Sequence, residues 1–175
     1  MSMTYRPDTT WDVKAKNFAT SRRDALVKLI KDNISGFADV QPEALPITRQ
    51  GAIGQKFPVA MVYITDEDST LDTNGKYTMK AGYAIMVANA GNQPASVKDD
   101  IVFGMASIRK LLSNNAYTDI DTAATYRYMT YPNYWNQSTL GPAKYSLPVP
   151  FQSDASSFWL IRAVAQFDIE WIALQ

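Results

Sequence analysis

Two carboxylates near the end of the sequence have a spacing that suits acid and base chemistry. Asp168 and Glu170 alternate with apolar residues in a run typical of a β-strand, which puts both side chains on one strand face, about 7 Å apart. Paired carboxylates at such a spacing can act as acid and base on a glycosidic bond. A polar outer strand face, or a ring of acids lining the lumen of an oligomer, explains the pair as simply. Both interpretations remain open on the sequence alone.

A second acidic group has the composition of a cation site. It comprises Asp66, Glu67, Asp68, Asp72 and the following Asn74 and Gly75. Oxygen ligands at alternate positions suit calcium, but the register fails. A calcium loop that starts at Thr70 puts Ala81 at the position of the bidentate glutamate. We therefore predict no metal here and interpret the charges as a solvated hairpin tip that discourages unwanted edge pairing.

The composition removes most other familiar catalytic groups. The chain has no histidine and no cysteine, so it lacks the commonest general base, the commonest metal ligand and the thiol nucleophile. Neither a dinucleotide-binding nor a P-loop glycine pattern occurs. The glycines at Gly51 and Gly54 precede an expected strand, whereas a phosphate site needs a helix N-terminus there. We expect no catalytic residue, no metal and no cofactor.

Length and charge bound the class of protein. The 175 residues are 46% hydrophobic and 19% charged, which predicts one folded domain. Seventeen basic groups balance seventeen acidic ones, so no long-range attraction to nucleic acid or to an anionic membrane is expected. The polar residues 1–16 do not form a secretion signal, and no run reaches the roughly 20 apolar residues of a membrane span. We expect a partner that is met by shape and apolar contact.

Two helices are predicted from apolar residues spaced three and four apart. The first covers residues 21–34 with Ser21 as its N-cap, and the second covers residues 97–112 with Ser96 as its N-cap. The charges of the second helix suit its dipole if its acids lie in the first turn and its bases in the last. These residues are Asp99, Asp100, Arg109 and Lys110.

The strands are predicted from residues that alternate or are rich in branched and aromatic types. Residues 57–65 and 77–90 form an expected hairpin around Asn74 and Gly75, with pairing that continues outward through residues 66–71. The alternation over residues 159–171 predicts a long final strand. A short strand is also expected over residues 45–48.

The segment 117–157 is unusual because it holds six of the ten tyrosines but few charges. Residues 125–131 within it are expected to form a strand. Planar rings can stack on sugars or bases, but only Arg127 and Lys144 supply the cations that a nucleic acid groove needs. A protein interface, in which aromatic residues are enriched and charges depleted, fits better. Equally, the rings can simply cover the sheet.

The order of these elements resembles that of bacteriophage tail terminator proteins. The resembling stretches are ALVKLIKDNI, FPVAMVYITDED, YTMKAGYAIMVANA, SVKDDIVFGMASIRKLL and FWLIRAVAQFDIEWIAL. The likeness lies in the pattern of elements and covers most of the chain from Ser21 onward. Residues 1–20 and 117–157 depart from the family outline.

The resemblance implies the fold. It predicts a single α/β (α+β) domain over residues 1–175, with residues 1–20 as an N-terminal arm and the Tyr- and Pro-rich residues 117–157 as an insertion before the last strand. One mixed or mostly antiparallel β-sheet would carry two main helices packed on one face.

The resemblance also implies a structural role in the virion, without catalysis. Such a protein is assembled in the host cytoplasm as a homo-hexameric ring that caps the head-proximal end of the tail tube, stops its growth and joins it to the neck. The implied partners are the tail tube protein, a neck or connector protein and, in a contractile tail, the sheath protein. DNA passes through the lumen without sequence-specific binding, and no membrane is involved.

Two alternatives stay open beside the terminator. One is another phage neck or head-tail joining protein, and the other is a carbohydrate-binding module or carboxylate glycosidase that uses Asp168 and Glu170. As subunit or partner interface we hypothesise two groups of residues. They are Tyr126, Tyr128, Tyr131, Tyr134 and Trp135 in the aromatic segment, and Asp66, Glu67 and Asp68 near the hairpin tip.

Overall fold

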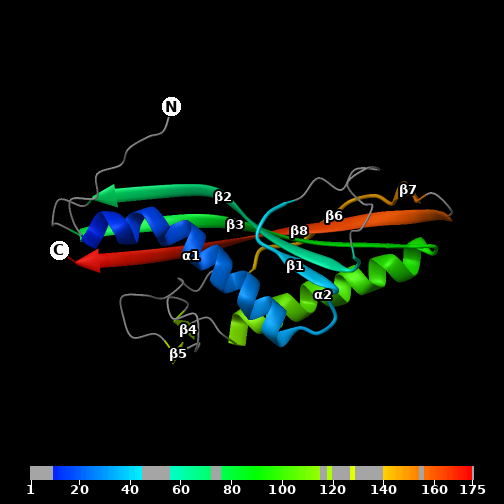
Figure 1. The fold of residues 1–175 in the computed structure, drawn as a ribbon, viewed down its shortest axis with the longest axis horizontal. Coiled ribbons are helices and arrows are strands. Elements are labelled where there is room, and N and C mark those ends of the chain that lie inside the picture. The colour runs from blue at the N-terminus through cyan, green and yellow to red at the C-terminus, as the bar shows by residue number, and fades with distance from the viewer. Residues whose placement is uncertain are drawn as a thin grey trace.

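The structure is a computed structural model that describes residues 10–44, 56–71, 76–114, 118–119, 127–128, 140–153 and 156–174. Two helices and one large sheet make up the body of the fold (Figure 1), which confirms the predicted α+β class. The elements are α1 Thr10–Asn33, β1 Asp39–Gln41, β2 Val59–Leu71, β3 Lys76–Gly91, α2 Pro94–Asn114, β4 Thr118–Asp119, β5 Arg127–Tyr128, β6 Lys144–Tyr145, β7 Val149–Ser153 and β8 Ser156–Leu174.

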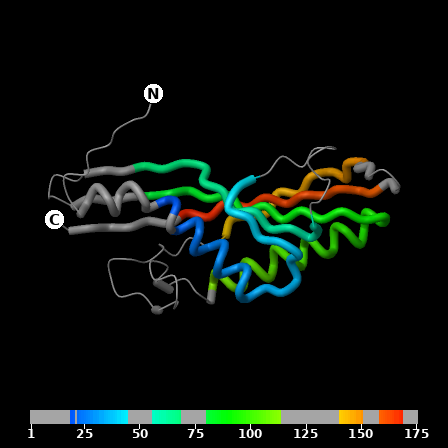
Figure 2. The backbone as a smooth tube through the Cα atoms, viewed as in Figure 1, coloured from blue at the N-terminus to red at the C-terminus, as the bar shows by residue number. Residues whose placement is uncertain are grey.

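The large sheet is mixed and is built around three long strands. Its order is β1-β2-β3-β8-β6, and β7 also pairs with β8. Only the β1 and β2 pair is parallel; every other pair in this sheet is antiparallel. Figure 2 shows the C-terminal strand β8 lying beside β3, with β6 and β7 along its other edge.

The strands β2 and β3 form the predicted hairpin. Pairing runs from Val59 opposite Ala88 outward to Leu71 opposite Tyr77, with one bulge between Ile64 and Asp66. The outward continuation through residues 66–71 is therefore confirmed, whereas the Asn74–Gly75 turn lies outside the described residues.

Both helices pack on the same face of the sheet, because alternation along β3 sends one apolar set toward them. This set packs with the inner sides of α1 and α2 in the main core. The strand residues are Ala81, Tyr83, Ile85 and Val87, and the helix residues include Leu26, Leu29, Ile30, Ile101, Met105 and Ile108. A smaller apolar cluster, centred on Met61, Met86 and Leu160, occupies the opposite face. We call the two sides the helix face and the far face.

Helix α1 is longer than predicted. It begins at Thr10, eleven residues before Ser21, so the prediction of Ser21 as its N-cap is wrong. The spacing of Trp11, Ala15 and Phe18 continues the helical period toward the N-terminus. The polar residues between them make this period hard to recognise, which is why residues 1–20 were predicted to be an N-terminal arm, although α1 already begins at Thr10.

Helix α2 also begins earlier, at Pro94, so Ser96 is not its N-cap. Proline suits the first helical position, where a missing N–H costs nothing, and the Val97 amide donates to the Gln93 carbonyl oxygen at 3.1 Å. Because the helix begins at Pro94, no acid lies in its first turn, and because it continues to Asn114, no base lies in its last turn. The predicted dipole placement of Asp99, Asp100, Arg109 and Lys110 is therefore wrong.

The shorter strands were the least predictable. The strand expected over residues 45–48 lies outside the described residues, and β1 was not anticipated because three residues carry no recognisable period. Of the strand expected over residues 125–131, the structure describes only β5, which pairs with β4.

Tyr83 links the sheet to α1 in the middle of the core. Its side chain is fully buried, and its hydroxyl donates to the Ala19 carbonyl oxygen at 2.9 Å. Replacing Tyr83 with Phe is expected to lower the free energy of unfolding by about 1 kcal/mol, because a buried carbonyl loses its donor. Urea unfolding at neutral pH measures this loss, and an unchanged midpoint would contradict it.

The same side chain makes stability depend on alkaline pH. Burial raises the pKa of Tyr83 strongly; the charge of Arg22 opposes this shift and that of Glu67 adds to it. Above pH of about 10 the unfolded tyrosine loses its proton while the folded one keeps it, so stability falls as pH rises. We expect part of this decline to disappear in Tyr83→Phe. Equal declines in both proteins from about pH 9 to 11 would show that Tyr83 is not its source.

Candidate interaction surfaces

The three predicted interface acids lie on β2 but not on one face. The β2 register puts Asp66 opposite Gly82 and Asp68 opposite Lys80 on the far face, whereas Glu67 lies opposite Ala81 on the helix face. All three are exposed. The structure therefore divides this group, with two carboxylates on one side of the strand and one on the other.

Asp66 covers a glycine on the far face. A Cβ at position 82 would collide with Asp66 Oδ1, and Thr65 Oγ1 donates to that oxygen at 2.7 Å. Glycine at position 82 thus gives the carboxylate room against the sheet. No group of three or more potential metal-ligating side chains occurs among the residues that the structure describes.

Asp168 and Glu170 occupy alternate positions on β8, as predicted, but the side chain of Glu170 lies outside what is described. Their backbone partners on β3 are Gly82 and Lys80, both on the far face. Asp168 forms an ion pair with Lys80 at 3.5 Å, and both side chains are about half exposed. A glycosidase acid sits in a desolvated apolar environment that keeps it protonated. The surroundings of Asp168 are open and carry a cation, so they give no support to that chemistry.

The aromatic half of the predicted interface is described in only one place. Tyr128 belongs to β5, where its backbone pairs with Thr118, and its side chain lies outside what is described. The other four residues lie outside the described residues altogether: Tyr126, Tyr131, Tyr134 and Trp135. Their role at an interface stays a prediction.

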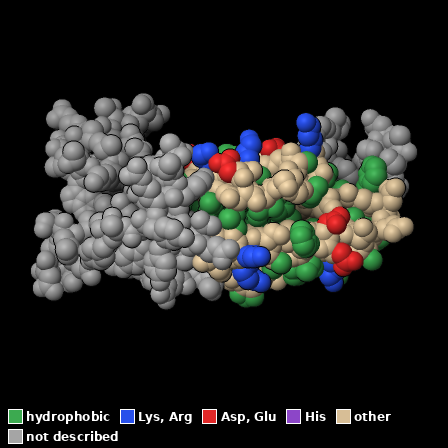
Figure 3. Space-filling view, turned by 90° about the horizontal axis from the view of Figure 1, so that it is seen from below, with side chains coloured by type: hydrophobic (Ala, Val, Ile, Leu, Met, Phe, Trp, Pro, Cys, Tyr) green, Lys and Arg blue, Asp and Glu red, His purple; other side chains and the backbone are tan. Residues whose placement is uncertain are grey.

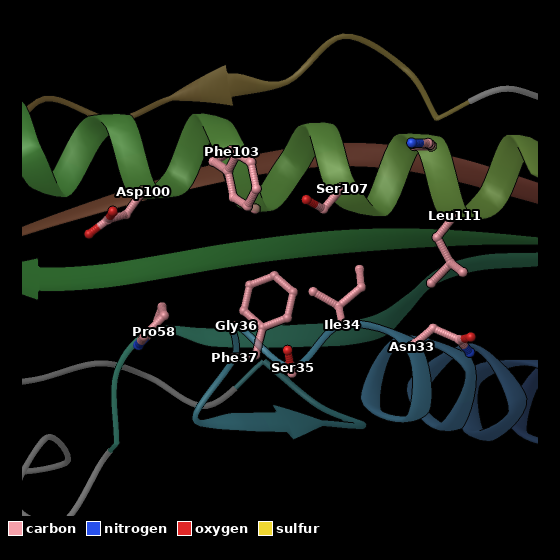
Figure 4. A pocket seen from close by; sticks show the side chains of 12 residues that line it. Asn33, Ile34, Ser35, Gly36, Phe37, Pro58, Asp100, Phe103, Ser107 and Leu111 are labelled. Carbon is pink, nitrogen blue, oxygen red and sulfur yellow. The ribbon is translucent and has the colours of Figure 1, made fainter.

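A groove of about 740 Å³ runs between α2 and the loop that follows α1. In Figure 4, Phe37 extends from this loop and Phe103 from α2, on opposite sides of the groove. Phe37 packs closely on Gly104, since a Cβ there would lie 3.2 Å from the ring. Asp100 also lines the groove and accepts from Asn89 Nδ2 at 3.0 Å. The groove is lined by apolar and polar side chains together, and the sequence did not reveal it.

Helix α2 exposes apolar side chains on its outer side. Phe103 is 75% and Val102 is 43% exposed, although both lie in the middle of the helix. Seen from the side of α2, Figure 3 shows apolar side chains at the surface between small groups of charges. One signal in the sequence marks these residues, because Val102 and Phe103 fall outside the apolar stripe of Ile101, Met105 and Ile108.

A second exposed apolar group lies along β6 and β7. Leu147 is 83% exposed, and it follows Tyr145 and precedes Val149, which are also exposed. The segment is held to β8 by hydrogen bonds. The Ser146 amide donates to the Arg162 carbonyl at 2.8 Å, and the Arg162 amide donates to Ser146 Oγ at 3.0 Å. This edge thus holds bulky apolar side chains at the surface in a fixed position.

The two edges of the sheet differ in charge. The β2 edge carries the three acids of residues 66–68, all exposed. On the opposite edge the described segment 140–150 has a single charged residue, the exposed Lys144. Arg109 of α2 lies beside this segment and donates to the Gly141 carbonyl at 2.8 Å. Residues 66–68 on one edge are therefore acidic, whereas the segment 140–150 on the other edge is apolar with one exposed lysine, and β8 itself carries Asp168 beyond that segment.

Each long edge strand is only partly paired. Among the described strands, β1 pairs with β2 only over Val59–Met61, and β6 and β7 pair with β8 only as far as Val164. Beyond that point, the Gly141 amide donates to the Gln166 carbonyl at 2.8 Å. The remaining lengths of β2 and β8 have no strand partner within the described part of the chain.

Comparisons with known proteins add little to these observations. Within the described residues, neither helix is long and apolar enough to cross a membrane. No protein-family model and no curated protein matches the sequence. Among solved structures there is a likeness to a chain in one described as "Virion of native gene transfer agent (GTA) particle", with 13% identity and a TM-score of 0.35. The likeness covers 85% of this chain and 93% of that chain. At this level of similarity it assigns no function.

Proposed function

We propose that this protein is a structural subunit of a phage-like virion, a tail terminator that forms a ring on the head-proximal end of the tail tube. The observation that carries the proposal is the pair of unlike sheet edges. The β2 edge carries the exposed acids Asp66, Glu67 and Asp68, whereas the segment 140–150 on the other edge is apolar, with Lys144 as its one charged residue. The order of elements resembles that of tail terminators, and this resemblance is the reason for proposing a terminator in particular.

Unlike edges on one subunit favour a head-to-tail contact over a self-paired one. When the acidic edge of one copy meets the basic edge of the next, the same contact repeats, and a suitable rotation closes it into a ring. Opposite charges at such a contact set the register and suppress the like-to-like arrangement. A hexamer is the ring size that the resemblance implies.

The ring would act through surfaces alone. It stops tube growth by covering the end on which tube subunits add, and its upper side meets the neck or connector protein. In a contractile tail the sheath protein would meet the same ring, and DNA would pass through the lumen without sequence-specific contacts. No catalytic group is needed for this role, and the protein would reside in the virion after assembly in the host cytoplasm.

The proposal is tested by mass and by capping. We expect native mass spectrometry to detect a closed oligomer, alone or after mixing with purified tail tubes. Negative-stain microscopy should show a ring at one end of each tube, and capped tubes should stop elongating. A monomer that leaves tubes uncapped and growing at every concentration would refute the terminator. A ring located inside the neck, away from the tube end, would instead identify another joining protein.

A further inference from the structure

The outer side of α2 carries a stripe of four exposed residues with a particular order. They are Asp99, Phe103, Ala106 and Lys110, spaced four, three and four residues apart, so they share one side of the helix. An acid therefore begins the stripe and a base ends it, with a large ring and a small side chain between. We call these residues the α2 stripe.

The α2 stripe is self-complementary when two helices pack antiparallel. The pair of Asp99 and Lys110 has the same midpoint along the helix as the pair of Phe103 and Ala106. A two-fold axis at that midpoint puts Asp99 opposite Lys110 of the second copy, and Phe103 opposite the small Ala106 of the second copy. The contact then holds two ion pairs around two rings, each packed against a methyl group.

Charge and exposure both favour this occupant. Asp99 and Lys110 are both exposed, and neither forms an ion pair with any residue that the structure describes. Phe103 is the most exposed aromatic side chain of the described part, at 75%. Burying such a ring at a contact removes a large apolar area from water, which favours association. The stripe is complementary to itself when a second helix packs against it in the opposite direction. This self-complementarity points to a second copy of this chain as the partner.

We propose that two copies of this chain pair through the α2 stripe about a two-fold axis. This contact is distinct from the head-to-tail contact of the proposed ring, because a two-fold contact ends after two copies whereas a ring contact repeats. The pairing therefore doubles whatever species the sheet edges form. A monomer becomes a dimer, and a ring becomes a pair of rings joined back to back. A single-helix contact is small, so the pairing depends on concentration.

The test uses the full-length chain and two charge reversals. We expect sedimentation equilibrium over a wide concentration range to show doubling of the wild-type mass. Asp99→Lys alone and Lys110→Glu alone should each abolish the doubling, because each puts like charges in contact. An equimolar mixture of the two variants should restore it, since both ion pairs re-form in the mixed pair. Phe103→Ala should weaken pairing by about tenfold or more.

Lys98→Glu is the matched control, because Lys98 is exposed on α2 but lies off the stripe. It should leave the doubling intact, and circular dichroism should be unchanged in every variant. The proposal is overturned if no doubling occurs at any concentration, if either single reversal leaves it intact, or if the mixture does not restore it. Lys144→Glu, on the basic sheet edge, tests the ring separately. If this variant loses the ring but still doubles its mass, the α2 pairing stands independently of the ring. If it keeps the ring but no longer doubles its mass, the pairing through the α2 stripe is refuted and the ring is not affected.

Discussion

Replacing Phe167 with Ala is expected to lower the free energy of unfolding by about 3–5 kcal/mol. Phe167 of β8 is 2% exposed and lies next to Tyr83 across the β3–β8 pair, where the two rings fill the core beneath α1. The truncation removes apolar burial and leaves a cavity that the surrounding sheet cannot close. A domain of this size has a total stability of about 5–15 kcal/mol, so the loss is a large share of it.

The matched control for this change is Phe103→Ala, the same substitution at a ring that is 75% exposed. Its effect on stability should stay within about 0.5 kcal/mol. Urea unfolding followed by circular dichroism measures both variants. Similar unfolding midpoints for the two would mean that Phe167 is not part of the core as described.

Reversing charge on one sheet edge should block assembly of the proposed ring without unfolding the subunit. Lys144→Glu makes the basic edge acidic, and the double change Asp66→Lys with Asp68→Lys makes the acidic edge basic. Like charges brought together at an interface cost about 2–5 kcal/mol, which weakens each contact by at least about thirtyfold. Native mass spectrometry should find monomers of each variant, or α2-paired dimers, where the wild type forms rings.

Mixing the two edge variants gives the sharper outcome. Alternating subunits restore opposite charges at every contact, so an equimolar mixture should assemble again. Lys31→Glu is the control, because Lys31 is exposed on α1 and belongs to neither edge strand. Assembly should also weaken as salt is raised, since exposed charges are screened. Rings formed by either edge variant alone would contradict the head-to-tail contact.

The long elements of the fold could be predicted from sequence because their patterns are local. The alternation in β3 and β8 and the apolar stripe of α2 each repeat over many residues, so one or two exceptions do not hide the period. Their ends were less predictable. Proline at position 94 starts α2 in place of the expected Ser96, because a helix start depends on which backbone groups find partners in three dimensions.

The candidate surfaces were predicted only in part. The exposure of Asp66, Glu67 and Asp68 could be anticipated from their charge, but their division between two faces depends on the bulge after Ile64. Whether Phe103 is core or surface could not be read from its type, because aromatic residues serve both. The groove beside it requires the loop after α1 to meet α2, which is a contact between segments far apart in the chain.

The sequence by itself determined the long strands β2, β3 and β8, the body of α2 and which side of each is apolar, together with a composition that lacks histidine and cysteine. These properties follow from residue type and period, which are written along the chain. Only the tertiary structure decided that β6 and β7 cover part of one edge of β8, that residues 66–68 and 140–150 lie on opposite edges of the sheet, and that Phe37 and Phe103 line one groove. Such features depend on which distant segments pack together, and that is settled by the burial of the whole core.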